Sequence, residues 1–176
     1  TLDLNDLTND YGGKFSFKDF GFTDEEATGL SDVLEGLKNA ATDSHIKGIS
    51  ILNSNLNLGM AQSKSLRDQL VEFKKSGKFI VAYADSYAQK DYYLNSVADT
   101  IFLNPVGELE LKGLASEVMY FKDFQEKSGI KMEIIRHGKY KSAVEPFLNN
   151  EMSPENREQI TSILQSVWQV IVQDIA

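Results

Sequence analysis

The sequence contains no cysteine and only three prolines among its 176 residues. The absence of cysteine excludes disulfides, cysteine-ligated zinc sites and thiol nucleophiles within this chain. No stretch approaches the roughly 18 consecutive apolar residues that a membrane-spanning helix requires. Residues 1–7 lack the basic and then apolar layout of a signal peptide, and residues 165–176 stop inside an apolar helical pattern without a cap signal. We therefore interpret the chain as a domain excised from a longer protein.

Positive charge is also scarce. The 18 lysines and arginines are outnumbered by 26 aspartates and glutamates, which gives a formal net charge of −8. No Lys/Arg-rich run is present to attract the phosphates of a nucleic acid, so we expect no nucleic-acid partner. The two histidines, His45 and His137, lie on different segments without a metal-binding motif. We expect no bound metal and no cofactor.

The rest of the composition is that of an ordinary globular protein, with 41% apolar and 25% charged residues. The length fits one domain with a sizeable core. We assign residues 1–176 to a single domain in which residues 1–22 form an irregular arm. Apolar periodicity predicts alternating helices and strands, and the predicted strands are residues 47–52, 79–83, 99–103 and 132–135. This pattern is typical of an α/β domain with a mainly parallel sheet that is covered on both faces.

Local signals mark the boundaries of the predicted helices. Thr23-Asp24-Glu25-Glu26 is a capping box before the first helix. Gly77 closes the second helix in the manner of a C′ glycine. Two further helices are predicted over residues 86–98 and 118–129. Ser153-Pro154 combines a good N-cap with a proline at the first helical position, and it predicts the start of a long last helix.

Three stretches of the sequence together resemble one family. The first is Phe73-Lys74-Lys75-Ser76-Gly77-Lys78 with the strand after it, and the second runs from Asp91-Tyr92-Tyr93 to Asn104-Pro105. The third and most specific is Gly138-Lys139-Tyr140-Lys141-Ser142-Ala143-Val144-Glu145-Pro146-Phe147, followed by Met152-Ser153-Pro154-Glu155. Their order and spacing resemble the amino-terminal half of the signal peptide peptidase A (protease IV) family.

That resemblance implies an α/β fold of the ClpP/crotonase type and a membrane-anchored serine peptidase built from two homologous halves. It places the general base of a Ser-Lys dyad at Lys141. It places the serine nucleophile in the carboxy-terminal half of the same protein. The implied substrates are remnant signal peptides. The implied location is the periplasmic side of the inner membrane, with the anchor outside this chain, and the implied assembly is a homo-oligomer.

A lysine can act as the base for a serine nucleophile only when its amine is neutral. The pKa of the amine must then be lowered from ~10.4 by burial among apolar groups. The neighbours that could provide part of that burial are Tyr140, Ala143, Val144 and Phe147. Without the motif, Lys141 would be interpreted as a solvated surface lysine, and that interpretation is kept for Lys139.

The segment that corresponds to the nucleophile lacks a serine in this half. Alignment with the catalytic half of the family places Gln89 at the nucleophile position and Lys90-Asp91 in place of glycines. The loop at residues 54–59 has a single glycine where a glycine-rich oxyanion loop is expected. Ser86 and Ser96 flank the nucleophile position but match it poorly. We therefore expect the isolated chain to be inactive as a peptidase.

Two alternative functions remain open. A crotonase-like acyl-CoA enzyme on the same fold would need two loop amides as an oxyanion hole and a carboxylate base, yet the loop after Leu52 is not glycine-rich. A noncatalytic scaffold for oligomer contacts would make the lysine motif structural. Fold alone does not separate these functions. Glu145 and Glu151 are candidates for orienting the lysine loop, although charged loop residues are usually solvated.

Overall fold

The computed structural model describes residues 1–5, 7, 10–11, 28–52, 56–129 and 142–176. These residues divide into two compact units, Thr1–Lys112 with Ile175 and Gly113–Asp174 with Ala176. The predicted capping box at residues 23–26 and the predicted strand at residues 132–135 lie outside the described residues. None of the helices in the described part of the chain has the length and apolarity needed to cross a membrane.

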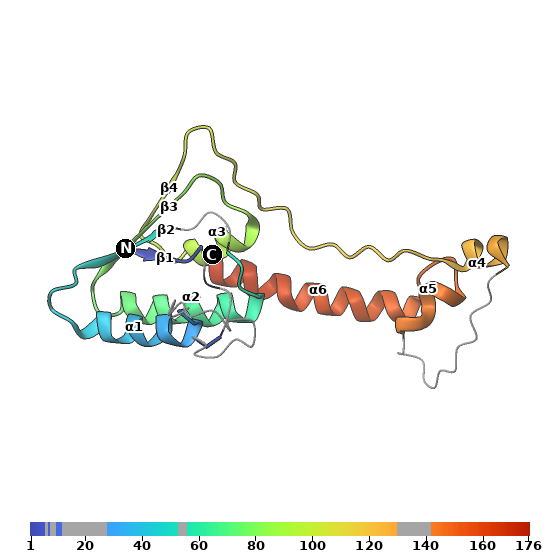
Figure 1. Ribbon diagram of the computed structural model, residues 1–176, viewed down its shortest axis with the longest axis horizontal. Coiled ribbons are helices and arrows are strands. Elements are labelled where there is room, and N and C mark those ends of the chain that lie inside the picture. The colour runs from blue at the N-terminus through green and yellow to red at the C-terminus, as the bar shows by residue number, and fades with distance from the viewer. Residues whose placement is uncertain (6, 8–9, 12–27, 53–55, 130–141) are drawn as a thin grey trace, which may run out of the picture. The chain divides into compact units, whose positions relative to one another are not determined.

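The first unit is built on a four-stranded parallel sheet with the order β1-β2-β3-β4 (Figure 1). The strands are β1 (Leu2–Asp3), β2 (Gly48–Leu52), β3 (Phe79–Ala84) and β4 (Thr100–Leu103). Gly48 pairs with Phe79, and a Cβ at Gly48 would lie only 2.5 Å from the Phe79 ring. Glycine therefore permits the aromatic ring to cover the start of β2. The strands and their connecting helices confirm the predicted α/β class.

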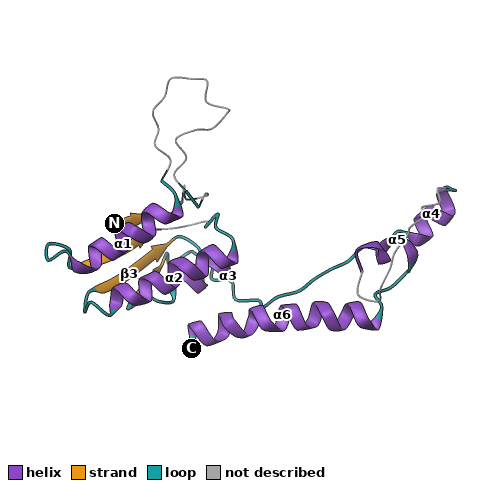
Figure 2. Ribbon diagram, turned by 90° about the horizontal axis from the view of Figure 1, so that it is seen from below, coloured by secondary structure: helices purple, strands orange, loops and turns teal. Residues whose placement is uncertain are grey.

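Three helices connect the strands, because parallel neighbours need a crossover segment. They are α1 (Leu30–Thr42), α2 (Met60–Lys74) and α3 (Gln89–Asn95), and they lie along one side of the sheet (Figure 2). Their apolar side chains and the facing strand residues form one core. Its fully buried members are Leu4, Ile51, Leu66, Leu70, Phe73, Ile80 and Leu94.

The two faces of this sheet differ in exposure. Ile49 and Ile51 of β2, with Ile80 and Ala82 of β3, are buried against the helices. The opposite face exposes a second apolar set, which comprises Leu52, Phe79, Tyr83 and Phe102. Among the described residues the helices thus cover one face, whereas the sequence pattern predicted cover on both. The continuous apolar runs of the strands supply both faces, because neighbouring residues of a strand point to opposite sides.

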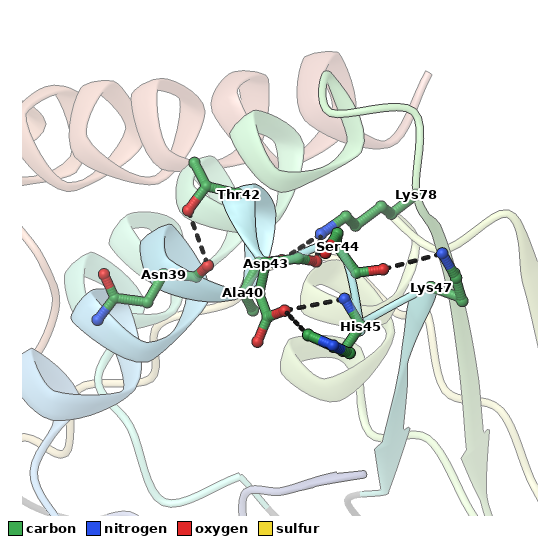
Figure 3. Close-up of polar contacts among 8 residues, drawn as sticks. All are labelled: Asn39, Ala40, Thr42, Asp43, Ser44, His45, Lys47 and Lys78. Carbon is green, nitrogen blue, oxygen red and sulfur yellow. Dashed lines mark hydrogen bonds and ion pairs between the residues drawn. The ribbon is translucent and has the colours of Figure 1, made fainter.

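The lysines of the first stretch, residues 73–78, make separate structural contacts. Lys78, just before β3, donates from Nζ to the carbonyl oxygens of Ala40 (2.5 Å) and Asp43 (2.6 Å) at the end of α1 (Figure 3). The last carbonyls of a helix have no partner inside the helix, and a cation there also opposes the negative end of its dipole. Gly77 precedes Lys78 with a positive φ of 80°. It lies at C″, two residues after the cap residue Lys75, and not at the predicted C′ position.

Lys74, the last residue of α2, connects the first stretch to the second. Its Nζ lies 2.8 Å from Oδ1 of Asp99 and donates to the carbonyl oxygen of Val97 at 2.9 Å. The other carboxylate oxygen of Asp99 accepts from the Ile80 amide at 2.8 Å. These bonds lower the pKa of Asp99, chiefly through Lys74 and then through the Ile80 amide. Asp99 therefore joins the end of α2 to β3 immediately before β4 begins.

The second unit contains helices in its described part. They are α4 (Lys122–Ser128), the 3₁₀ turn η1 (Ser142–Val144), α5 (Glu145–Leu148) and α6 (Pro154–Ile175). Ser153 caps α6 as predicted, since its side chain accepts a hydrogen bond from the Asn156 amide at 3.2 Å. Gly129 ends α4 with a φ of 71°. The predicted helix over residues 118–129 begins later, at Lys122.

Candidate functional site

The predicted general base, Lys141, comes immediately before a described segment in the sequence. Lys141 belongs to residues 130–141, which lie outside the described residues, as do Lys139 and His137. The description resumes at Ser142, the residue after Lys141, with η1 and then α5. The structure therefore describes the part of the lysine motif that follows Lys141, with side chains from Ala143 onward.

Glu145, four residues after Lys141, is one of the most deeply buried polar residues of the second unit, with 2% of its surface exposed. Its Oε1 accepts a hydrogen bond from the Ser153 hydroxyl at 2.5 Å. Its Oε2 accepts from the Ser153 amide at 3.3 Å and from Asn156 Nδ2 at 3.0 Å. Glu151, by contrast, is exposed. The usual solvated state of a charged loop residue thus applies to Glu151 and not to Glu145.

The next two residues of the motif are attached to the beginning of α4. The Phe121 amide donates to the carbonyl oxygen of Pro146 at 2.6 Å, and Gln125 Nε2 donates to that of Phe147 at 3.0 Å. The rings of Phe121 and Phe147 are stacked, with centroids 5.7 Å apart and planes inclined by 22°. The motif is therefore fixed on two sides, by α6 through Glu145 and by α4 through Pro146 and Phe147.

Tyr120 lies beside this arrangement. Its hydroxyl is buried and has no hydrogen-bond partner among the described residues. Burial raises the pKa of the phenol above its usual value, and the negative charge of Glu145 adds to this effect. Tyr120 is consequently a neutral phenol at physiological pH.

The position predicted for the missing nucleophile lies at the start of a helix. Gln89 is the first residue of α3 and is half-buried. A carboxamide at this position has no nucleophilic oxygen–hydrogen group to activate. Of the flanking serines, Ser86 is exposed, and Ser96 accepts a hydrogen bond from Arg67 at 2.8 Å while donating to the Tyr93 carbonyl at 3.0 Å.

The loop after β2 is held by α3 in a way that the sequence did not reveal. Asp91 accepts a hydrogen bond from the Leu56 amide at 2.8 Å, and Lys90 Nζ donates to the Leu58 carbonyl at 2.6 Å. Leu56 and Leu58 are themselves buried, at 2% and 1% exposure. The only sequence signal was the replacement of paired glycines by Lys90-Asp91. In the described part of this loop, the Asp91 carboxylate thus accepts from the Leu56 amide, which could otherwise donate to a bound anion.

The remaining candidates are peripheral. The His45 side chain is 93% exposed and its ring lies 3.0 Å from the Asp43 carboxylate, to which the His45 amide also donates at 2.8 Å (Figure 3). No three His, Asp or Glu side chains in the described residues are grouped so that they could hold a metal ion.

The described residues of the first unit form an α/β domain on a parallel sheet. The model of peptidase family S49 matches residues 72–176, and the chain belongs to this family. All three stretches that carry the resemblance fall within the matched region. Membership confirms the resemblance to the protease IV family and the ClpP/crotonase-like fold that it implied.

Several curated relatives are similar over most of the chain. Protease 4 of Haemophilus influenzae is 39% identical over 138 residues, which are 78% of this chain and 22% of that protein. Protease 4 of Salmonella typhi is 35% identical over 80% of this chain and 23% of its own length. The chloroplastic serine protease SPPA of Arabidopsis thaliana is 32% identical over 79% of this chain and 20% of its own length. The matched part of the chain therefore spans about a fifth of each relative.

Proposed function

We propose that this chain is the lysine-bearing, amino-terminal half of a membrane-anchored Ser-Lys peptidase that degrades remnant signal peptides. Lys141 is the general base, and the serine nucleophile belongs to the carboxy-terminal half of the same protein. The observations that carry the proposal are the lysine motif in the sequence, whose described part is held through Glu145, and a glutamine, Gln89, at the start of α3. Family membership and the names of the relatives support peptidase chemistry.

The proposed chemistry divides between the two halves. A serine hydroxyl is a weak nucleophile, so a neutral lysine amine accepts its proton while the oxygen attacks the scissile carbonyl. The resulting ammonium then donates that proton to the departing amine, which leaves an acyl-enzyme. Water attacks the acyl group with the same amine as base, and the acid product is released. Lys141 provides one base for both steps.

The location and assembly of the whole protein follow from the same proposal. The domain lies on the periplasmic side of the inner membrane, and another segment supplies the anchor. The partners are peptide substrates, the carboxy-terminal half and further copies of the protein. An acyl-CoA enzyme is less well supported, because the Leu56 amide of the loop after β2 is already engaged by Asp91.

The proposal is tested with the full-length protein and a signal-peptide-like substrate. We expect Lys141→Ala to lower kcat/KM by about 10²–10⁴-fold, the usual contribution of a general base. Lys141→Arg should be almost as damaging, because a guanidinium stays protonated at any workable pH. Lys139→Ala is the matched control and should be close to wild type. Near-normal turnover by Lys141→Arg would remove Lys141 from the mechanism and favour the noncatalytic scaffold.

A further inference from the structure

We propose that Glu145 is a positioning residue for the general base and fixes the chain that leads directly to Lys141. The inference rests on the proposed function, because Glu145 has this task only if Lys141 is the base. It adds a residue that does not touch the substrate and acts through the backbone of the lysine motif.

The burial of Glu145 is the first part of the argument. A carboxylate with 2% exposure is costly unless its oxygens are well supplied with hydrogen bonds. The donors come from Ser153 and Asn156, at the N-terminal end of the 22-residue helix α6. A negative charge is also favoured there by the helix dipole. Glu145 is therefore held in one place by donors that are themselves part of a long helix.

The short connection to Lys141 is the second part. Only the 3₁₀ turn η1, Ser142–Val144, separates Lys141 from Glu145. We infer that a shift of Glu145 is passed along this three-residue turn to the lysine. On the other side, the carbonyls of Pro146 and Phe147 are bound to Phe121 and Gln125. Residues 145–147 are thus bound on two sides, to α6 through Glu145 and to α4 through Pro146 and Phe147.

The demand of the chemistry is the third part. A general base must come within roughly 2.6–3.2 Å of the proton that it removes. A misplacement of about 1 Å by a residue remote from the chemistry can cost on the order of 10²-fold in rate. A change at Glu145 should therefore reduce kcat far more than it changes KM, since the position of the base affects the chemical step.

The experiment compares three variants of the full-length protein. Glu145→Gln keeps the size of the side chain but places an amide donor among the donors of Ser153 and Asn156. Ser153→Gly removes the hydroxyl that Glu145 accepts from, and glycine is still a tolerated N-cap for α6. Glu151→Gln makes the same charge change as the first variant at an exposed position six residues away. Each kcat is normalised to the folded fraction, measured by circular dichroism.

We expect kcat to fall by about 10- to 100-fold in Glu145→Gln, and by a smaller factor in Ser153→Gly, with KM within about two-fold of wild type in both. Glu151→Gln should keep both constants. A purely structural role would lower the melting temperature and leave kcat per folded molecule unchanged, and that result for Glu145→Gln would overturn the inference. If Glu145→Gln does not fold, Ser153→Gly decides: a lowered kcat supports the inference and a normal one refutes it.

The Lys141 variants separate this inference from the proposed function. Inactive Lys141→Ala and Lys141→Arg proteins with a fully active Glu145→Gln protein would refute only the positioning role. An active Lys141→Arg protein would refute the proposed function and the positioning role with it.

Discussion

The carboxylate of Asp91 accepts a hydrogen bond of 2.8 Å from the backbone amide of Leu56, which lies 35 residues earlier in the chain. The bond joins the first turn of α3 to the loop after β2. Both residues are 2% exposed, so water cannot replace either partner without opening the core. The described part of the loop is thus bound from inside the domain, by a residue that the sequence resemblance aligned with a glycine of the catalytic half.

Removal of this carboxylate should destabilise the chain. Asp91→Ala leaves the Leu56 amide buried without an acceptor, and we expect a loss of about 1–3 kcal/mol in the free energy of unfolding. Asp91→Asn retains one acceptor oxygen and should lose less. Urea unfolding of the purified chain measures both. The exposed Asp68, which pairs with Lys64 across one helical turn, provides the control, and Asp68→Ala should cost only about 0.3–0.5 kcal/mol. Equal losses for Asp91→Ala and Asp68→Ala would show that the buried bond contributes nothing special.

The ion pair between Lys74 and Asp99 should give a pH-dependent contribution to stability. Because Lys74 and the Ile80 amide lower the pKa of Asp99 in the folded state, the contribution is fully present above the unfolded pKa of about 3.9. It is lost as the pH falls through the lowered pKa. The stability difference between wild type and Asp99→Asn should therefore be constant near neutral pH and shrink in acid. The Asp99 side chain is 44% exposed, so solvent screening limits the difference to about 1 kcal/mol or less. A difference that grows below pH 4 contradicts this assignment.

Lys78 should contribute more to stability than its neighbour Lys75. Lys78 donates to two carbonyl oxygens at the end of α1, whereas Lys75 pairs with Glu72 at an exposed site. We expect Lys78→Ala to lower the free energy of unfolding by about 1–2 kcal/mol and Lys75→Ala by at most about 0.5 kcal/mol. Thermal unfolding followed by circular dichroism compares the two variants. Identical melting temperatures would argue against a capping role for Lys78.

The isolated chain should not react with serine-directed phosphonates. Gln89 at the start of α3 has no hydroxyl, and the serines near it are exposed (Ser86) or hydrogen bonded to Arg67 and Tyr93 (Ser96). Intact-mass spectrometry after incubation with a fluorophosphonate is expected to show the unmodified mass. Gln89→Ser should remain unlabelled as well, since Lys141 is proposed to serve a serine of the other half. Stoichiometric labelling of any serine in the wild-type chain would refute the assignment of this half.

The sequence by itself determined the features that depend on neighbouring residues. Apolar periodicity marked the strands β2, β3 and β4, and a serine followed by a proline marked the start of α6, because caps and periodicity act within a few residues. Its motifs also identified the family, since the spacing of three stretches is a property of the chain alone. The lysine at position 141 was likewise chosen from the motif, and its role stays a prediction.

Where local patterns failed, a contact from elsewhere in the chain decided the outcome. The helix predicted from residue 118 begins at Lys122, because the Phe121 amide is already bound to the Pro146 carbonyl. The helix predicted from residue 86 begins at Gln89, because Tyr87 forms a bridge with Leu109. In both cases a backbone hydrogen bond to a distant segment competes with the first turn of the helix.

Only the tertiary structure decided which charged residues are internal partners. The sequence offered Glu145 and Glu151 as equal candidates for orienting the lysine loop. In the structure Glu145 is buried and hydrogen bonded to Ser153 and Asn156, while Glu151 is exposed. Asp91 likewise accepts a hydrogen bond from the Leu56 amide. A carboxylate is stable inside a protein only where donors from other segments converge on it, and that convergence is set by the fold and not by the local sequence.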